Sequence, residues 1–229
     1  MEKKMEKEKN IYHFGKLKFE GEYLNGKRNG NGKEYYDGKL RFEGQYLNDQ
    51  RSGNGKEYYK NGKLKFEGEH LNGKIWNGNG YNIDGTLDFE IKDGKGNVKE
   101  YYENDYLKFE GDYLNGERNG KGIEYDYIQK IIYEGEDYTQ KIIYEGEYLN
   151  GKRNGKGKQY NIDGNLEFEG DYLNGKRNGK GKEYNIYLAE DWSLKNVLKY
   201  EGEYLEDERN GKGKEYYQNG KLKFEGEYL

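Results

Sequence analysis

The chain has 229 residues, of which 37% are charged and 31% hydrophobic, and its formal net charge at pH 7 is −4. It carries too little aliphatic mass for a thick layered core, no cysteine for a disulfide framework, and too little positive charge to favour nucleic acid as a partner. No apolar run approaches the roughly 20 residues of a membrane span, and the charged residues 1–10 do not resemble a signal peptide. We therefore expect an intracellular, cytoplasmic protein.

One sequence unit recurs along nearly the whole chain, and its most regular copy is residues 168–184, FEGDYLNGKRNGKGKEY. Each copy opens with an aromatic residue followed by Glu-Gly, and many successive copies lie 23 or 24 residues apart. A fixed period in the range of about 20 to 50 residues indicates a repeat array. The opening aromatic residues are Phe19, Phe42, Phe66, Phe109, Tyr133, Tyr144, Phe168, Tyr200 and Phe224.

Each unit is predicted to form a β-hairpin. In residues 166–173, apolar or small residues alternate with mostly charged ones, which is typical of a half-exposed strand. Asn174 and Gly175 then tolerate the positive φ angles of a tight turn, and residues 179–184 form the return strand. We predict an all-β fold: an elongated, twisted, single-layer antiparallel array of about nine hairpins.

Glycine recurs inside the predicted strands, always two residues after the opening aromatic residue, as in Gly21 after Phe19 and Gly170 after Phe168. A strand interior normally disfavours glycine, because glycine loses more entropy and packs nothing. We therefore predict that an aromatic ring lies across each bare stretch of main chain. Repeated along the array, these contacts would form a ladder of rings over glycines.

The pattern aromatic-x-Gly-x-aromatic-x-x-Gly-x-x-x-Gly-x-Gly resembles the MORN repeat, over roughly residues 12–229. Asp49, His70 and Glu206-Asp207 depart from the pattern, and Tyr58–Lys63 and Tyr216–Lys221 are similar to a bacterial variant of the repeat. The resemblance implies a non-catalytic scaffold that binds proteins or membranes. The motif residues are Phe19, Gly21, Tyr23, Gly26, Gly30 and Gly32 in the first copy, and Phe168, Gly170, Tyr172, Gly175, Gly179 and Gly181 in the most regular copy.

Along the chain, residues 1–10 are expected to be a disordered charged tail, and residues 11–229 one repeat array. A shortened hairpin is expected at the degenerate unit 89–108. Residues 126–147 contain an 11-residue duplication, which either adds a single strand or loops out of the sheet. Residues 185–199 are an insertion, which we expect to cover its own sheet as a decorated turn. The alternatives are an apolar helix face formed by Leu188, Trp192, Leu194 and Leu198, an extended hairpin, or a docking knob led by Trp192.

Signals of catalysis are absent from the sequence. His13 and His70 occupy positions that hold tyrosine in other copies, so we expect them to replace rings rather than bind metal. The Gly-x-Gly-Lys strings lack the spacing of a phosphate-binding loop. We expect no enzyme activity and no cofactor.

Basic residues follow the opening strand of several units and form the candidate contact site of the sequence. In register they would line one edge, where they either meet anionic phospholipid or an acidic partner or brace the turns. The strand that ends the array would also expose an edge for self-association. We expect a protein-binding scaffold, with peripheral membrane binding or an antitoxin-like neutralising role as alternatives. The candidate contact residues are Lys27, Arg28, Lys152, Arg153, Lys176, Arg177 and Trp192.

Overall fold

The computed structural model describes residues 6–11, 16–132, 135–188 and 194–229. All 18 strands belong to one antiparallel sheet, and the described residues contain no helix. The all-β hairpin array is therefore confirmed. The strands are β1 (Glu6–Ile11), β2 (Leu17–Leu24), β3 (Lys27–Tyr36), β4 (Lys39–Leu47), β5 (Gln50–Tyr58), β6 (Leu64–Leu71), β7 (Lys74–Tyr81), β8 (Leu87–Lys92), β9 (Lys95–Tyr101), β10 (Leu107–Leu114), β11 (Glu117–Ile132), β12 (Gly135–Leu149), β13 (Lys152–Tyr160), β14 (Leu166–Leu173), β15 (Lys176–Leu188), β16 (Leu194–Leu205), β17 (Glu208–Tyr216) and β18 (Leu222–Tyr228).

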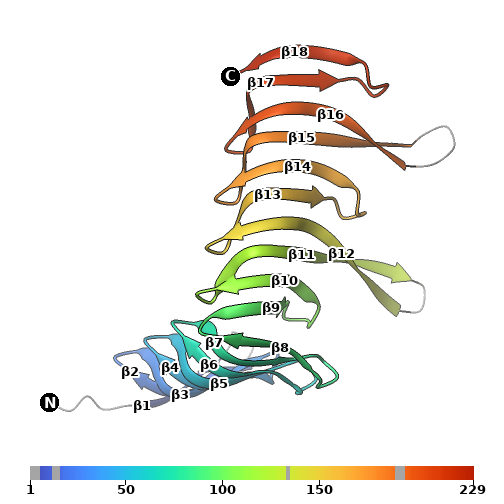
Figure 1. The fold of residues 1–229 in the computed structure, drawn as a ribbon. Coiled ribbons are helices and arrows are strands. Elements are labelled where there is room, and N and C mark those ends of the chain that lie inside the picture. Colours follow the sequence, from blue (N-terminus) through green and yellow to red (C-terminus); the bar gives the residue numbers. More distant parts are fainter. Residues whose placement is uncertain (1–5, 12–15, 133–134, 189–193) are drawn as a thin grey trace. The chain divides into compact units, whose positions relative to one another are not determined.

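The chain divides into two compact units, where the sequence suggested one array. Unit 1 contains residues 1–105 and 112–117, and unit 2 contains residues 106–111 and 118–229. Within unit 2, each strand from β12 to β18 pairs with its neighbours in the chain (Figure 1). Each unit is described below by itself.

The turns between the strands of a hairpin fit two-residue loops with positive φ. Asn174 and Gly175 have φ angles of 53° and 94°, which match the turn that suits the twist of a hairpin. Glu206 and Asp207 replace Asn-Gly but keep the same geometry, at 54° and 77°. A hydrogen bond compensates for this backbone strain, since the Oδ1 of Asp207 accepts the main-chain N–H of Arg177 at 2.8 Å.

The core of each unit is a ladder of rings on one face of the sheet. In unit 2, Phe168 lies edge to face with Tyr172 of its own unit, at 5.5 Å between centroids, and with Tyr204 of the next, at 5.2 Å. A Cβ atom added to Gly170 would lie 2.7 Å from Phe168 Cζ, and one added to Gly181 only 2.5 Å from Phe168 Cε2. The predicted rings over glycines are confirmed, because only glycine lets the main chain come so close.

The degenerate unit forms the expected short hairpin, β8–β9. Ile91 stands where other copies have glycine and is buried beside Val98 and Phe66. Ile91 thus fills the space beside Phe66 that is bare main chain in other copies, while the Phe89 ring lies over Gly80 of the preceding strand, where an added Cβ atom would meet it.

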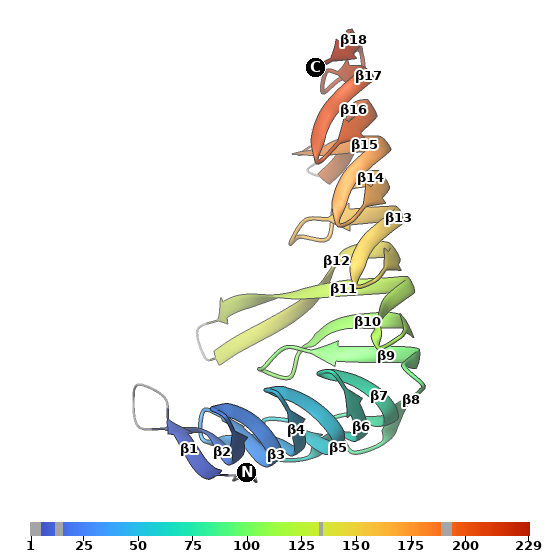
Figure 2. The same ribbon diagram turned by 90° about the vertical axis from the view of Figure 1, so that its left-hand side faces the viewer.

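The duplication at residues 126–147 forms neither an added strand nor a loop. Residues 126–132 and 135–141 form the two arms of one long hairpin, in a register that runs from Asp126 opposite Lys141 to Ile132 opposite Gly135. The last residues of the second copy continue β12 beside the start of β11. The hairpin projects past the ends of β13 and β14 (Figure 2). The described residues of the insertion, 185–188 and 194–199, lengthen β15 and β16, which pair as far as Leu188 opposite Leu194. This is the extended-hairpin alternative, and the rest of the insertion lies outside the described residues.

Residues 6–11 form strand β1, although the sequence analysis placed residues 1–10 in a disordered tail. β1 pairs with β2 so that Lys7 faces Glu22 and Lys9 faces Glu20, and the Nζ of Lys9 lies 3.6 Å from a carboxylate oxygen of Glu20. The alternating charges that suggested a solvated tail therefore match the charges of the neighbouring strand.

Candidate binding groove and the arginine row

The two faces of the sheet carry different side chains, because side chains alternate along each strand. One face, the ring face, holds the aromatic ladder and the arginines. The opposite face of unit 2 is hollowed into a groove, whose floor is the bare main chain of glycines such as Gly157, Gly170 and Gly181. Unit 1 has a similar groove that includes Gly32, Gly44 and Gly55.

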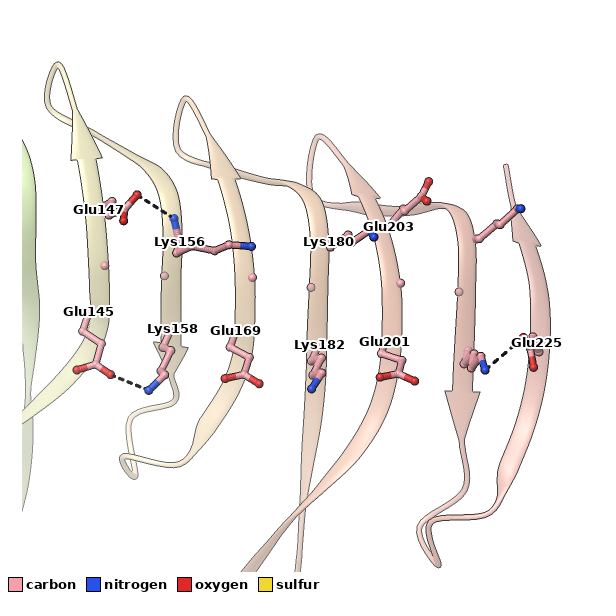
Figure 3. Close-up of a pocket in the computed structure, with 18 of the residues that line it drawn as sticks. Glu145, Glu147, Lys156, Lys158, Glu169, Lys180, Lys182, Glu201, Glu203 and Glu225 are labelled. Atoms are coloured by element: carbon pink, nitrogen blue, oxygen red, sulfur yellow. Dashed lines mark hydrogen bonds and ion pairs between the residues drawn. The ribbon is translucent and has the colours of Figure 1, made fainter.

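The walls of the unit 2 groove alternate in charge from strand to strand (Figure 3). Most opening strands contribute Glu-Gly-Glu and most return strands Lys-Gly-Lys; the exceptions are Lys121-Gly122-Ile123 in β11 and Glu169-Gly170 in β14. The lining contains seven lysines and seven glutamates. Neighbouring groups pair across strands, as Lys158 does with Glu145 at 3.4 Å and Lys214 with Glu225 at 3.3 Å. In unit 1, asparagines such as Asn31 and Asn54 replace one lysine of the return strand, so its groove carries amides where unit 2 carries charges.

Tyrosines near the ends of the return strands hold the groove glutamates in place. The hydroxyl of Tyr160 donates to Glu145 at 2.6 Å, and that of Tyr184 donates to Glu169 at 2.7 Å. Both tyrosines have raised pKa values, chiefly because of partial burial and then because of the hydrogen bond to a carboxylate. These pairs are separated by 15 residues, a spacing that the sequence analysis did not use.

The arginines of the predicted contact site lie on the ring face and mostly brace it. Arg153 stacks over the ring of Tyr144 at 4.1 Å and pairs with Glu124 at 2.5 Å. Arg28 likewise pairs with Glu34 at 2.5 Å. Burial raises the pKa of Glu34, but Arg51 and Arg28 outweigh burial and lower it overall. These arginines therefore stabilise the ring face through internal ion pairs and ring contacts.

The remaining predicted contact residues are not gathered into one site. Lys27, Lys152 and Lys176 are exposed at hairpin turns, and Lys176 pairs with Glu206 at 2.7 Å. Arg177 stacks over Phe168 at 4.3 Å. Trp192 and His13 lie outside the described residues. At the predicted self-association edge, Phe224 is 45% exposed, whereas its counterpart Phe168 is fully buried.

His70 replaces a tyrosine of the ladder, as the sequence predicted. Its ring is buried between Phe42 and Phe66, and its Nε2 lies 3.3 Å from Glu57. In the part of the chain that the structure describes, no group of three or more His, Cys, Asp or Glu residues could hold a metal ion. No helix among these residues is long and apolar enough to cross a membrane.

Comparison with protein families agrees with this repeating geometry. The model of the MORN repeat matches six segments, residues 19–39, 42–63, 109–127, 144–166, 168–185 and 200–221, which together cover more than half of the chain. The chain belongs to the MORN repeat family. MORN repeats are commonly scaffolds for interaction with proteins or membranes. No curated protein matches the chain.

Proposed function

We propose that this MORN protein is a non-catalytic scaffold that binds another polypeptide along the groove of unit 2. The observation that carries the proposal is the lining itself, with seven lysines and seven glutamates beside a floor of glycine main chain. Strands lie about 4.8 Å apart, so like charges recur about every 9.6 Å along the groove. A polypeptide with both acidic and basic side chains complements this pattern.

The balance of charge favours a polypeptide over a membrane. An anionic bilayer attracts clustered lysines and arginines, but each row of groove lysines here is interleaved with carboxylates. On the ring face, Arg28 and Arg153 are committed to glutamates. The membrane alternative is supported by the exposed lysines at the turns, Lys27 and Lys152. No observation favours the antitoxin-like role.

A library of random peptides tests the proposal directly. Peptides would be selected on the full chain, and their affinities measured for wild type and for a Lys180→Glu, Lys182→Glu variant. Both lysines are exposed in the groove, and neither forms an ion pair within 4 Å with another described residue. We expect selected peptides of mixed charge and at least a tenfold loss of affinity in the variant.

The matched control makes the same charge change outside the groove, as Lys27→Glu with Lys152→Glu. We expect it to bind the selected peptides within twofold of wild type. If the selected peptides bind the groove variant as tightly as the turn variant, the groove is not the binding site. The membrane alternative predicts a different result. Wild type and the groove variant would sediment with phosphatidylserine vesicles in a salt-sensitive manner, and the Lys27→Glu, Lys152→Glu variant would not.

A further inference from the structure

The ring face repeats a linkage in which one glutamate joins two arginines. The first arginine lies six residues before the glutamate, as Arg118 does before Glu124 at 3.2 Å. The second comes from the following repeat, as Arg153 does at 2.5 Å. Unit 1 shows the same linkage, in which Glu34 pairs with both Arg28 and Arg51. A buried guanidinium needs such a partner, since it keeps its charge in proteins.

In unit 2, one repeat has Gln159 in place of the glutamate of this linkage. It lies six residues after Arg153, where the linkage calls for a glutamate. Its amide accepts a hydrogen bond from the Tyr172 hydroxyl at 3.3 Å and donates one to Glu167 at 3.3 Å. The amide therefore fills the position of the carboxylate without supplying its charge.

The glutamate on the other side of Arg177 is already engaged. Glu183 lies six residues after Arg177, but its Oε1 accepts from Lys199 at 2.5 Å and its Oε2 accepts from Arg209 at 2.7 Å. Burial raises the pKa of Glu183, but these two cations outweigh burial and lower it overall. Both carboxylate oxygens are thus held by other residues.

The guanidinium of Arg177 consequently has no ion pair within 4 Å among the described residues, because the nearby Asp207 carboxylate accepts the main-chain N–H of Arg177 instead. It is half-buried, with its guanidinium 4.3 Å from the centre of the Phe168 ring. The other five arginines in equivalent positions, Arg28, Arg51, Arg118, Arg153 and Arg209, each pair with at least one glutamate. Of these six arginines, Arg177 alone has no glutamate within 4 Å of its guanidinium among the described residues.

We propose that Arg177 binds a carboxylate from an acidic side chain of a partner polypeptide. Carboxylate is the chemistry that equivalent positions already hold, as Glu34 and Glu124 show, and guanidinium groups bind it through two parallel hydrogen bonds. Arg177 lies on the ring face, opposite the groove, so this contact is additional to the groove and rests on the proposed function only in taking a polypeptide as the partner.

The test follows the Nε–Hε resonances of the arginines in the full chain by NMR during titration with hexaglutamate. We expect the signal of Arg177 to shift saturably, while that of Arg209, whose partners are internal, does not. Inorganic phosphate is the second arm and should shift Arg177 at least tenfold more weakly. Equal responses to phosphate and hexaglutamate, or equal shifts of Arg177 and Arg209, would overturn the proposal.

The decisive variant is Gln159→Glu, which supplies the missing internal carboxylate. It should weaken hexaglutamate binding at Arg177 at least tenfold. Because Glu167 lies 3.3 Å from the Gln159 amide and would repel the new carboxylate, the variant also carries Glu167→Gln, and its thermal midpoint should stay near that of wild type, so unfolding cannot explain the loss. Lys176→Gln, at the adjacent exposed turn, should change binding less than twofold. Unchanged binding by Gln159→Glu would refute the site. The groove variant Lys180→Glu, Lys182→Glu should leave the Arg177 response intact, which separates failure here from failure of the groove.

Discussion

Phe42 and His70 lie edge to face, with their ring centroids 5.3 Å apart and their planes at 87°. The same histidine meets Phe66 at 5.5 Å and 83°. Phe168 and Tyr172 make the equivalent contact at 5.5 Å and 88°. A histidine therefore continues the ladder with nearly the same geometry as tyrosine, which shows that the ladder requires a flat ring more than a particular residue.

Removal of the ring at position 70 should be costly. His70→Ala leaves a cavity between two buried phenylalanines and should lower the free energy of unfolding by about 3 kcal/mol. His70→Tyr, which restores the ring of the other copies, should stay within about 1 kcal/mol of wild type. Urea unfolding followed by circular dichroism measures both, and a His70→Ala variant as stable as wild type would contradict the account of the ladder.

A methyl group beneath a ring should destabilise unit 2. Gly181→Ala would place its Cβ 2.5 Å from Phe168 Cε2, so we expect a loss of about 1–3 kcal/mol from overpacking. Phe168→Leu removes the ring and should cost about as much by itself. The double variant should be more stable than the sum of the two single losses predicts, because the methyl group introduced by Gly181→Ala no longer clashes once the Phe168 ring is removed. Strict additivity in this cycle would mean that the ring does not lie on Gly181.

Acid should weaken unit 1 through Glu57. Burial raises the pKa of this carboxyl, but the hydrogen bond to His70 and the charge of Arg51 outweigh burial and hold it at about 2, below its usual 4.5. Because the folded-state value is the lower one, the stabilisation is complete above about pH 4.5 and is lost as the pH falls toward 2. It amounts to roughly 3 kcal/mol.

A comparison of unfolding free energies at pH 6 and pH 3 tests this contribution. Wild type should lose more stability between these values than Glu57→Gln, whose amide does not titrate. Glu225→Gln, on the half-open end strand, is the matched control and should lose as much as wild type. An equally steep pH dependence in Glu57→Gln would exclude Glu57 as the source.

Alkali should reveal the tyrosine–glutamate pairs of the groove. Burial and then a hydrogen bond to Glu20 raise the pKa of Tyr35 to about 12, and the hydrogen bond to Glu201 comes first in raising that of Tyr216 to about 12. Because the folded-state values exceed the usual 10, the stabilisation is complete below pH 10 and is lost as the pH rises through 12.

Absorbance at 295 nm measures the ionised phenols. At pH 11 the folded protein should show markedly fewer phenolates than the same chain in denaturant. Glu201→Gln should allow Tyr216 to ionise earlier, which adds one phenolate to the folded protein at that pH. Identical titrations of the folded and denatured chain would contradict the hydrogen bonds to the glutamates.

Much of this architecture is readable in the sequence because it depends on local periodicity. The alternation around Phe168, the glycine two residues later and the Asn174-Gly175 turn all lie within a few neighbours, and each predicts its own contact. His70 could be placed in the ladder because it falls at a fixed position in the period.

Features that depend on pairing between distant residues were not predictable in the same way. Most hairpins contain a shift in strand register. The shift between Gly170 and Tyr172 brings Arg177 opposite Tyr172. The glutamates with which the arginines pair are determined by this register shift and not by sequence spacing alone. The duplication at 126–147 was ambiguous because its period permits several pairings, and only the three-dimensional register selects pairing with itself.

The most direct test of the central claim is a spectrum of the full chain labelled with ¹⁵N-glycine, recorded with and without a selected mixed-charge peptide. Glycines lie both on the groove floor and at the hairpin turns, so one spectrum reports on the proposed site and on a control surface. We predict that the amide signals of groove glycines such as Gly157, Gly170 and Gly181 shift on binding, while those of turn glycines such as Gly151 and Gly164 do not. Shifts confined to the turn glycines would contradict the groove as the binding surface of this protein.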